Sequence, residues 1–335
     1  MKPETSERLF IEDLFRASVT EKKVDIEAIE SIERLTGDAS TRRYYRIYCT
    51  HTSYVVCLDN PSDDENTFVR KQRFLEKNQV RVPMVYDCIP SKGYILEEDL
   101  GDVTLIQNLA RVSSREEEKN LYTKIIDQLI KIHSINTSES SLFLDQFDEE
   151  KLMQEIDFSI KFFIGKRLGD TNLDLHKKVA SEFRKICKNI ASKEMVLTHR
   201  DFHSRNVMVK GDELIIIDFQ DARMGIPQYD LASLLDDCYY EIDDGNKNDL
   251  LKYYFDNTPR KDQETFEEFL LLYNEIALQR VFKAIGSFSY IYELRADERY
   301  LKWIGFAMEK LKKILFTREE YSDLRVSLFE IYYES

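Results

Sequence analysis

Cysteine, proline and glycine are scarce in this sequence of 335 residues, which contains 5 Cys, 6 Pro and 10 Gly. The cysteines form no Cys-X-X-Cys pair and their number is odd, so the sequence predicts neither a disulfide framework nor a zinc site. We therefore expect reduced thiols that are mostly buried.

Long apolar runs are also missing. No segment approaches the roughly 20 apolar residues that a membrane helix needs, and the N-terminal residues carry charges at short intervals. This pattern predicts a cytoplasmic protein with no membrane partner. Acidic residues outnumber basic ones by 62 to 48, which gives a net charge of −14. A nucleic-acid partner is therefore not expected, because binding to phosphate backbones needs clustered Lys and Arg.

The first part of the chain is rich in β-type residues. Five short runs predict strands, at residues 29–35, 44–48, 54–58, 84–89 and 94–96. A helix-like stretch at about residues 64–78 interrupts them. We therefore expect a small sheet in the order of three strands, one helix and two strands.

The rest of the chain has mainly helical periodicity. A helix is predicted behind the cap candidates Ser113 and Ser114, another at about residues 149–163, and more from Tyr229 to the end, with Trp303 in the core. With 43% hydrophobic residues, the chain can bury a core in each of about two domains. We predict an α+β protein with an N-terminal domain of residues 1–100 and a helical domain of residues 101–335, connected through residues 97–100.

Polar residues interrupt two short strands at residues 207–209 and 214–217, which a glycine-containing connection joins as a hairpin. Asn206 enters the first strand and Asp218 leaves the second, so we expect both at the open end of the hairpin. Amide and carboxylate oxygens suit Mg²⁺, which prefers few protein ligands together with substrate phosphates. Asp201 precedes Asn206 by five residues. Its carboxylate can accept the proton of a hydroxyl group that attacks a metal-bound phosphate.

These residues carry a family resemblance. The segments HRDFHSRN and IDFQDA resemble the catalytic and metal-binding motifs of protein kinases, and more closely those of the aminoglycoside-phosphotransferase superfamily. Four further segments resemble the bacterial cell-wall amino-sugar kinases: GDASTRRYYR, LEEDLGD, FDEEKLMQE and YDLASLLDD. The resemblance implies a bilobal protein-kinase-like fold. It also implies a kinase that uses ATP and Mg²⁺ to phosphorylate a small molecule, such as N-acetylmuramate or N-acetylglucosamine.

The resemblance also implies roles for individual residues. Asp201 would be the catalytic base, His203 would contact the transferred phosphate, and Asn206 and Asp218 would hold Mg²⁺. Asp230 would brace the catalytic loop. The residues expected at the nucleotide are Gly37, Ser40, Arg43, Glu97, Glu98 and Leu100.

One feature of kinases is missing. The third predicted strand has no lysine to contact the nucleotide phosphates, and only Gly37 offers a flexible phosphate loop. We expect an arginine at the start of the preceding strand to replace that lysine, and choose Arg43 over Arg42 and Arg46 because of its position after the turn.

Two alternatives to an amino-sugar kinase stay open. An acidic cluster that includes Asp237 would attract a cationic acceptor, such as an aminoglycoside or a choline-like amine. The missing strand lysine would instead fit a nucleotide-binding protein without catalysis. If the acceptor is N-acetylmuramate, its carboxylate needs a cation, and Arg280 and Lys283 lie one helical turn apart.

Overall fold

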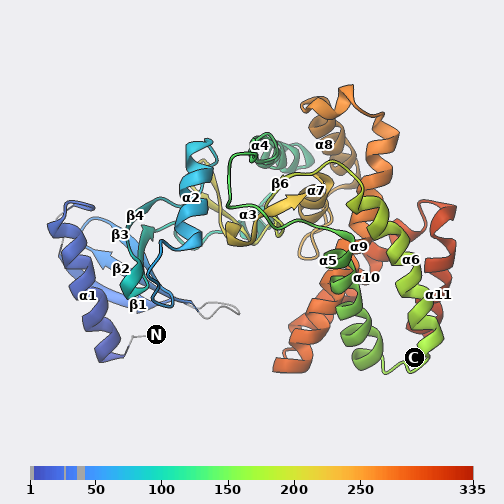
Figure 1. The fold of residues 1–335 in the computed structure, drawn as a ribbon, viewed down its shortest axis with the longest axis horizontal. Coiled ribbons are helices and arrows are strands. Elements are labelled where there is room, and N and C mark those ends of the chain that lie inside the picture. The colour runs from blue at the N-terminus through green and yellow to red at the C-terminus, as the bar shows by residue number, and fades with distance from the viewer. Residues whose placement is uncertain (1–3, 26–27, 36–41, 335) are drawn as a thin grey trace. The chain divides into compact units, whose positions relative to one another are not determined.

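The computed structural model describes residues 4–25, 28–35 and 42–334. The chain divides into two compact units. The first contains Met1–Thr104 and Val207–Gln220, and the second contains Leu105–Asn206 and Asp221–Ser335. Each unit is described by itself below, with the elements labelled in Figure 1.

The first unit contains the predicted sheet. Its five strands are antiparallel and lie in the order β1-β2-β3-β5-β4. They are β1 (Ile29–Arg34), β2 (Arg43–Cys49), β3 (Ser53–Leu58), β4 (Val85–Ile89) and β5 (Tyr94–Glu98), with α2 (Thr67–Lys77) between β3 and β4 and the short η1 (Pro90–Lys92) between β4 and β5. The predicted order of three strands, one helix and two strands is confirmed.

The helix α1 (Thr5–Thr20) was not predicted from the sequence. It lies along one face of the sheet (Figure 1) and buries Ile11 and Phe15 against Tyr45 and Tyr54. Ile11 and Phe15 are four residues apart and therefore share one helical face. This buried apolar stripe is narrow, and the remaining positions mix charged, polar and exposed apolar residues such as Leu9 and Phe10, so the helical periodicity is weak in the sequence.

A hairpin from the middle of the chain also belongs to the first unit. Its strands β7 (Val207–Lys210) and β8 (Glu213–Ile216) are joined at Gly211, whose φ of +59° suits a glycine. The Val209 N–H donates to the carbonyl of Val103, and the Ile216 N–H donates to that of Arg81. The hairpin was predicted correctly, but within a continuous domain of residues 101–335. These backbone bonds place it instead with the first unit.

The second unit is mainly helical, as predicted. Its elements up to the last of its strands are α3 (Leu105–Leu109), α4 (Arg115–His133), α5 (Glu149–Ser159), η2 (Ile160–Arg167), α6 (Leu173–Ala191), β6 (Val196–Thr198) and β9 (Arg223–Gly225), the last preceded by η3 (Phe219–Asp221) at the boundary of the units. They are followed by α7 (Gln228–Leu235), α8 (Asp244–Asp256), η4 (Pro259–Asp262), α9 (Phe266–Arg295), α10 (Arg299–Leu315), η5 (Glu319–Tyr321) and α11 (Ser322–Glu334). The strands β6 and β9 pair antiparallel.

Local signals in this unit are largely confirmed. The Ser114 hydroxyl caps α4 by accepting a hydrogen bond from the Glu117 N–H. The helix expected at residues 149–163 is α5, which ends at Ser159 and continues as the π-helix η2. Trp303, expected in the core, is only partly buried.

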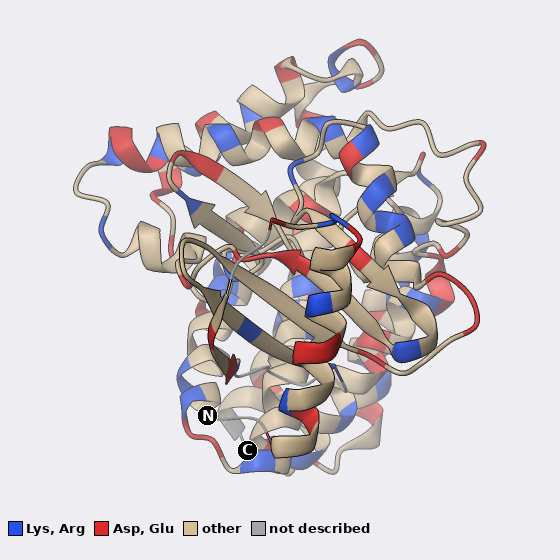
Figure 2. Ribbon diagram, turned by 90° about the vertical axis from the view of Figure 1, so that its left-hand side faces the viewer, with Lys and Arg blue, Asp and Glu red and all other residues tan. Residues whose placement is uncertain are grey.

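Charged residues of both signs are distributed along the helices and strands (Figure 2). Within the described part of the chain, no helix has the length and apolar character needed to span a membrane. All five cysteines are free thiols, and four of them are buried, as expected.

Two helical glycines provide a test of the close contact between α9 and α5. A Cβ added to Gly286 on α9 would lie 2.2 Å from the Ser159 Oγ and 2.5 Å from its Cα. Gly286→Ala should therefore lower the free energy of unfolding by about 1–3 kcal/mol, as overpacking typically does. Gly305→Ala on α10 is the matched control, because no atom lies within 4 Å of its added Cβ. It should stabilise the protein by up to about 1 kcal/mol through helix propensity. Urea unfolding measures both, and equal effects would contradict the assignment of a tight crossing.

Candidate active site

The loop between β6 and β7 begins with two backbone groups that one carboxylate holds. Asp230 on α7 is fully buried. Its Oδ2 accepts a hydrogen bond of 2.7 Å from the His199 N–H, and its Oδ1 accepts one of 2.9 Å from the Arg200 N–H. The predicted bracing role of Asp230 is confirmed. His133 on α4 supports it in turn, with its Nε2 lying 3.2 Å from the Asp230 Oδ2.

Arg200 is fixed from its other side as well. Its φ of +85° lies in the left-handed region, which costs a non-glycine residue about 1–3 kcal/mol. The Arg280 Nη1 on α9 donates a hydrogen bond of 2.8 Å to the Arg200 carbonyl. The Arg280 guanidinium also lies 4.4 Å from the ring centroid of Tyr229 on α7. Two helices thus hold the strained residue that precedes Asp201.

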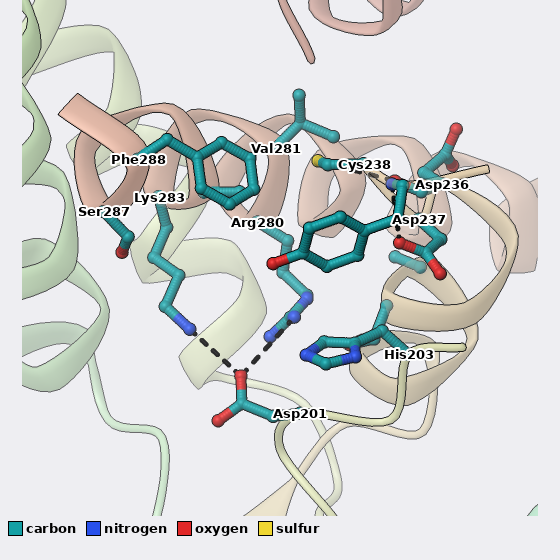
Figure 3. Close-up of a pocket in the computed structure, with 14 residues that line it drawn as sticks. Asp201, His203, Asp236, Asp237, Cys238, Arg280, Val281, Lys283, Ser287 and Phe288 are labelled. Carbon is teal, nitrogen blue, oxygen red and sulfur yellow. Dashed lines mark hydrogen bonds and ion pairs between the residues drawn. The ribbon is translucent and has the colours of Figure 1, made fainter. Parts of the chain in front are cut away.

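Asp201 faces three cations, of which Figure 3 shows Lys283 and Arg280. Its Oδ1 lies 3.1 Å from the Lys283 Nζ and 3.7 Å from the Arg280 Nη2, while its Oδ2 lies 3.7 Å from the Arg200 Nε. Burial alone would raise the pKa of Asp201, but the charges of Lys283, Arg280 and Arg200 outweigh it and hold the pKa well below its usual range. Asp201 is therefore an ionised carboxylate, which is the form that can accept a proton.

A pocket in the second unit opens beside Asp201 (Figure 3). It lies between the loop after β6, the segment that follows α7, and α9. Its polar lining includes Asp201, His203, Asp237, Tyr239, Lys283 and Ser287. A carboxylate base at the wall of a pocket is the arrangement required to act on a bound hydroxyl group.

His203 lies in this pocket, as Figure 3 shows. Its ring packs edge-on against Tyr239, with 5.5 Å between the ring centroids. Burial lowers the pKa of His203, which favours the neutral imidazole. Its Nδ1 is buried and has no hydrogen-bond partner among the described residues. These contacts place the side chain at the pocket, and its contact with a phosphate stays a prediction.

The acidic cluster after α7 has structural partners. The Asp237 carboxylate accepts hydrogen bonds of 2.9 Å from the Ser204 and Tyr239 N–H groups. Asp236 pairs with Lys247 at 2.6 Å and accepts a hydrogen bond from the Tyr273 hydroxyl. Asp237, which we expected to attract a cationic acceptor, is thus engaged by backbone groups, and Asp236 by side chains of the same unit. They hold the wall of the pocket.

Arg280 and Lys283 also differ from their predicted setting. They lie on one face of α9 as expected, but both side chains are directed at Asp201. Arg280 is only 8% exposed and binds the loop backbone. These contacts correct the expectation that the Arg280 side chain binds the carboxylate of N-acetylmuramate. Lys283 lines the pocket and keeps access to a ligand.

A cluster of aromatic side chains beside the pocket was missed by the sequence reasoning. Tyr239 packs edge-on against Trp303 on α10, with 5.0 Å between the ring centroids. The Arg205 guanidinium lies 5.0 Å from the Tyr239 centroid and 5.8 Å from that of Trp303. These residues are far apart in the chain, so no local pattern indicates that they meet. Only the tertiary structure shows that these aromatic side chains lie together beside the pocket.

The predicted magnesium ligands flank the β7–β8 hairpin. Asn206 directly precedes Val207, and its Nδ2 donates a hydrogen bond of 2.9 Å to the Asp201 carbonyl. This bond is made by the amide nitrogen, and the amide oxygen Oδ1 is the atom of this side chain that could ligate a metal. Asp218 follows β8 by two residues, has a φ of +66°, and accepts a hydrogen bond from the Gln220 side chain. An amide oxygen and a carboxylate fit Mg²⁺. The described residues contain no group of three His, Cys, Asp or Glu side chains that could hold a metal by themselves.

Among the residues expected at the nucleotide, Gly37 and Ser40 lie outside the described part of the chain. The three arginines of β2 and its start all pair with carboxylates. Arg43 lies half-exposed on the α1 side of the sheet, which weakens its assignment as the phosphate ligand. The pairs are Arg42 with Asp59, Arg43 with Glu7, and Arg46 with Asp99 and Asp102.

Two cations of the first unit lie near α2. Arg42 extends over Phe68, with 5.5 Å between its guanidinium and the ring centroid. Lys71 on α2 is only 6% exposed and donates a hydrogen bond of 2.6 Å to the Gln220 carbonyl. The kinase pattern places the phosphate-binding lysine on the third strand, so the sequence does not single out Lys71 as a candidate.

The predicted connecting residues have different environments. Glu98 pairs with Arg81 and Lys210 at 2.8 Å each, and despite its burial these cations lower its pKa to about 2. Leu100 packs with Met208 and Ile215 of the hairpin. Glu98 and Leu100 thus attach the hairpin to the sheet. Their contact with a nucleotide stays a prediction.

Known proteins are similar to this chain over most of its length. The model of the phosphotransferase enzyme family matches residues 31–264. A Neisseria meningitidis protein named N-acetylmuramate/N-acetylglucosamine kinase is 26% identical over 301 residues, which cover 88% of this chain and 89% of that protein. A Pseudomonas putida protein of the same name is 26% identical, with 90% of this chain and 88% of that protein covered.

Solved structures show the same fold at lower identity. An aminoglycoside phosphotransferase with bound ADP is 20% identical and superposes with a TM-score of 0.59 over 92% of this chain and 98% of that one. A choline kinase from Streptococcus pneumoniae is 17% identical, with a TM-score of 0.59 over 90% and 99% of the two chains. The predicted protein-kinase-like fold is therefore confirmed.

Glu97 offers a test of the buried polar face of β5. Burial raises its pKa to about 8 from the usual 4.5, although Arg42 opposes this effect. Between pH 4.5 and about pH 8, Glu97 keeps its proton in the folded protein and loses it in the unfolded chain. The free energy of unfolding therefore falls as the pH rises through this range. Glu97→Gln should remove this dependence and gain stability relative to the wild type toward pH 8. Thermal unfolding at both ends of the range measures the effect.

The exposed Glu33 on β1 supplies the matched control for that experiment. Glu33→Gln should leave the pH dependence of the unfolding midpoint as it is in the wild type. A Glu97→Gln variant with the same pH dependence as the wild type would show that Glu97 is ionised in the folded protein.

Proposed function

Since this chain belongs to the phosphotransferase enzyme family, we propose that it transfers the γ-phosphoryl group of ATP to a hydroxyl group of an amino sugar such as N-acetylmuramate or N-acetylglucosamine. The names of the relatives and their coverage of most of the chain support this acceptor class. The observation that carries the proposal is the ionised Asp201 at the wall of a pocket in which cations balance the acidic side chains.

The charge balance of the pocket favours an acceptor that is neutral or anionic. Asp201 faces Lys283 and Arg280, and Asp236 is paired with Lys247. The two oxygens of Asp237 accept backbone N–H groups. A cationic aminoglycoside or choline-like amine would meet only carboxylates that already have ion-pair or hydrogen-bond partners here. N-acetylated sugars carry no ammonium group and fit such a lining better.

A nucleotide-binding protein without catalysis is a weaker interpretation. The loop pays a conformational cost at Arg200, and buried groups of α7 and α9 hold Asp201 in place. A protein that only bound nucleotide would have no need of an ionised base beside an acceptor pocket. The geometry therefore supports an active phosphotransferase.

In the proposed reaction, the acceptor hydroxyl binds within hydrogen-bond distance of Asp201. Its oxygen attacks the γ-phosphorus, the bond to the bridging oxygen of ADP breaks, and the hydroxyl proton moves to Asp201. We assign Asn206 and Asp218 to Mg²⁺ from the spacing of the motif. When bound, Mg²⁺ neutralises phosphate charge. The first unit would supply the nucleotide site, and His203 would contact the transferred group.

The proposal includes the setting of the enzyme. We propose that it works in the cytoplasm on a small molecule and has neither a nucleic-acid nor a membrane partner. The net charge of −14 supports the first of these absences.

The acceptor class can be tested by measuring ADP release from ATP and Mg²⁺ with a panel of acceptors. N-acetylmuramate and N-acetylglucosamine should give the highest kcat/KM, because the carboxylates of the pocket already have ion-pair or hydrogen-bond partners. Glucosamine, with its free amine, is the matched control for N-acetylglucosamine. Higher kcat/KM with aminoglycosides or choline would overturn the acceptor assignment. If none of the acceptors on the panel stimulated ADP release, the amino-sugar function would be refuted.

Two substitutions separate the proposed base from the proposed metal ligand. Asp201→Asn should lower kcat on the order of 10²-fold or more, within the range of general-base catalysis, while Mg²⁺-dependent nucleotide binding persists. Asp218→Ala should weaken that binding, because a ligand to the metal is lost. Calorimetric titration with nucleotide, with and without Mg²⁺, distinguishes the two. Identical binding by wild type and Asp218→Ala would remove Asp218 from the metal site.

A further inference from the structure

Lys283 on α9 contacts the carboxylate of Asp201, which lies in the loop between β6 and β7. It lies in the middle of α9, and its Nζ is 3.1 Å from the Asp201 Oδ1 (Figure 3). Arg280, one turn earlier on the same helix, lies 3.7 Å from the same oxygen. Both cations of α9 are thus on Oδ1, whereas Oδ2 has the more distant Arg200 Nε at 3.7 Å. We therefore take Oδ2 as the oxygen that accepts the proton.

Arg280 and Lys283 do not have the same task. Arg280 is buried, stacks on Tyr229 and donates to the Arg200 carbonyl, so it holds the loop. For Lys283 the described residues show one hydrogen bond, to Asp201. Its ammonium group has three N–H donors, and its side chain is 18% exposed in the pocket. Lys283 therefore has N–H donors beyond the one that contacts Asp201, and it lines the pocket beside that carboxylate.

We propose that Lys283 is a catalytic residue, whose ammonium group contacts the acceptor oxygen and the phosphoryl group that this oxygen receives. The inference rests on the proposed phosphotransferase function. An acceptor hydroxyl on the Asp201 Oδ2 lies close to a cation on Oδ1, since the two oxygens share one carbon. As the oxygen–phosphorus bond forms and the bond to ADP breaks, the proton moves to Asp201. Lys283 keeps its three protons throughout.

The physical reason is the charge that moves during transfer. Negative charge passes through the equatorial oxygens of the phosphoryl group, and a fixed cation in a partly buried site stabilises it more than solvent does. Asp201 holds the ammonium group in place before the substrates bind, so little reorganisation is needed. The same ion pair offsets part of the desolvation cost that either charge would have alone in this partly buried site.

The first test is steady-state kinetics with the best amino-sugar acceptor. Lys283→Met should lower kcat on the order of 10²- to 10³-fold, while the KM for ATP changes by less than about threefold. Lys283→Arg should restore part of kcat, because it keeps the cation. Lys302→Met on α10 is the control, since Lys302 is exposed, and it should behave as the wild type. A Lys283→Met variant within about threefold of the wild-type kcat would overturn the proposal.

The second test does not depend on the acceptor. Aluminium fluoride with ADP and Mg²⁺ mimics the transferred phosphoryl group, so it should tighten ADP binding to the wild type and to Lys283→Arg, and not to Lys283→Met. Lys283→Gln, which keeps a neutral donor, replaces the Met variant if that variant does not fold. The role of Lys283 would be overturned if aluminium fluoride tightened ADP binding to Lys283→Met as much as to the wild type, or if it did not tighten ADP binding to the wild type. A lysine-dependent effect in a protein that phosphorylates no amino sugar would refute the acceptor proposal and leave this one intact.

Discussion

The left-handed conformation of Arg200 depends on two helices that hold its peptide groups from opposite sides. Asp230 on α7 accepts its N–H, and Arg280 on α9 donates to its carbonyl. Without these bonds, a residue with a φ of +85° would relax toward a lower-energy conformation. Because Asp201 is the next residue, its carboxylate would then lose its position beside Lys283. The position of Asp201 at the pocket thus depends on polar contacts between elements that are distant in the chain.

Four buried carboxylates of the protein are used for internal contacts. Asp230 and Asp237 accept backbone N–H groups, while Asp236 and Glu98 pair with lysine or arginine. A carboxylate buried without such partners would carry a large desolvation penalty. The net charge therefore says little about the charge that a substrate meets in the pocket. That local charge depends on where α9 places its two cations.

The cations of the first unit lie at positions other than the third strand, where the kinase pattern has a lysine. The arginines around β2 all pair with carboxylates, and the alternation of the strand puts Arg43 on the face that α1 covers. Arg42 and Lys71 lie instead near α2. The first unit therefore has cations near α2, although its third strand has no lysine.

The sequence by itself determined what depends on local periodicity and spacing. Alternating runs predicted the five strands of the sheet, a serine cap and apolar periodicity predicted α4, and the HRDFHSRN motif predicted the base and its loop. The tertiary structure alone decided the partners of those residues. Lys283, Tyr239 and Trp303 meet around the pocket from distant segments, and α1 is recognisable only by the sheet that it covers. Such contacts arise from the packing of whole elements, which a pattern of neighbouring residues does not record.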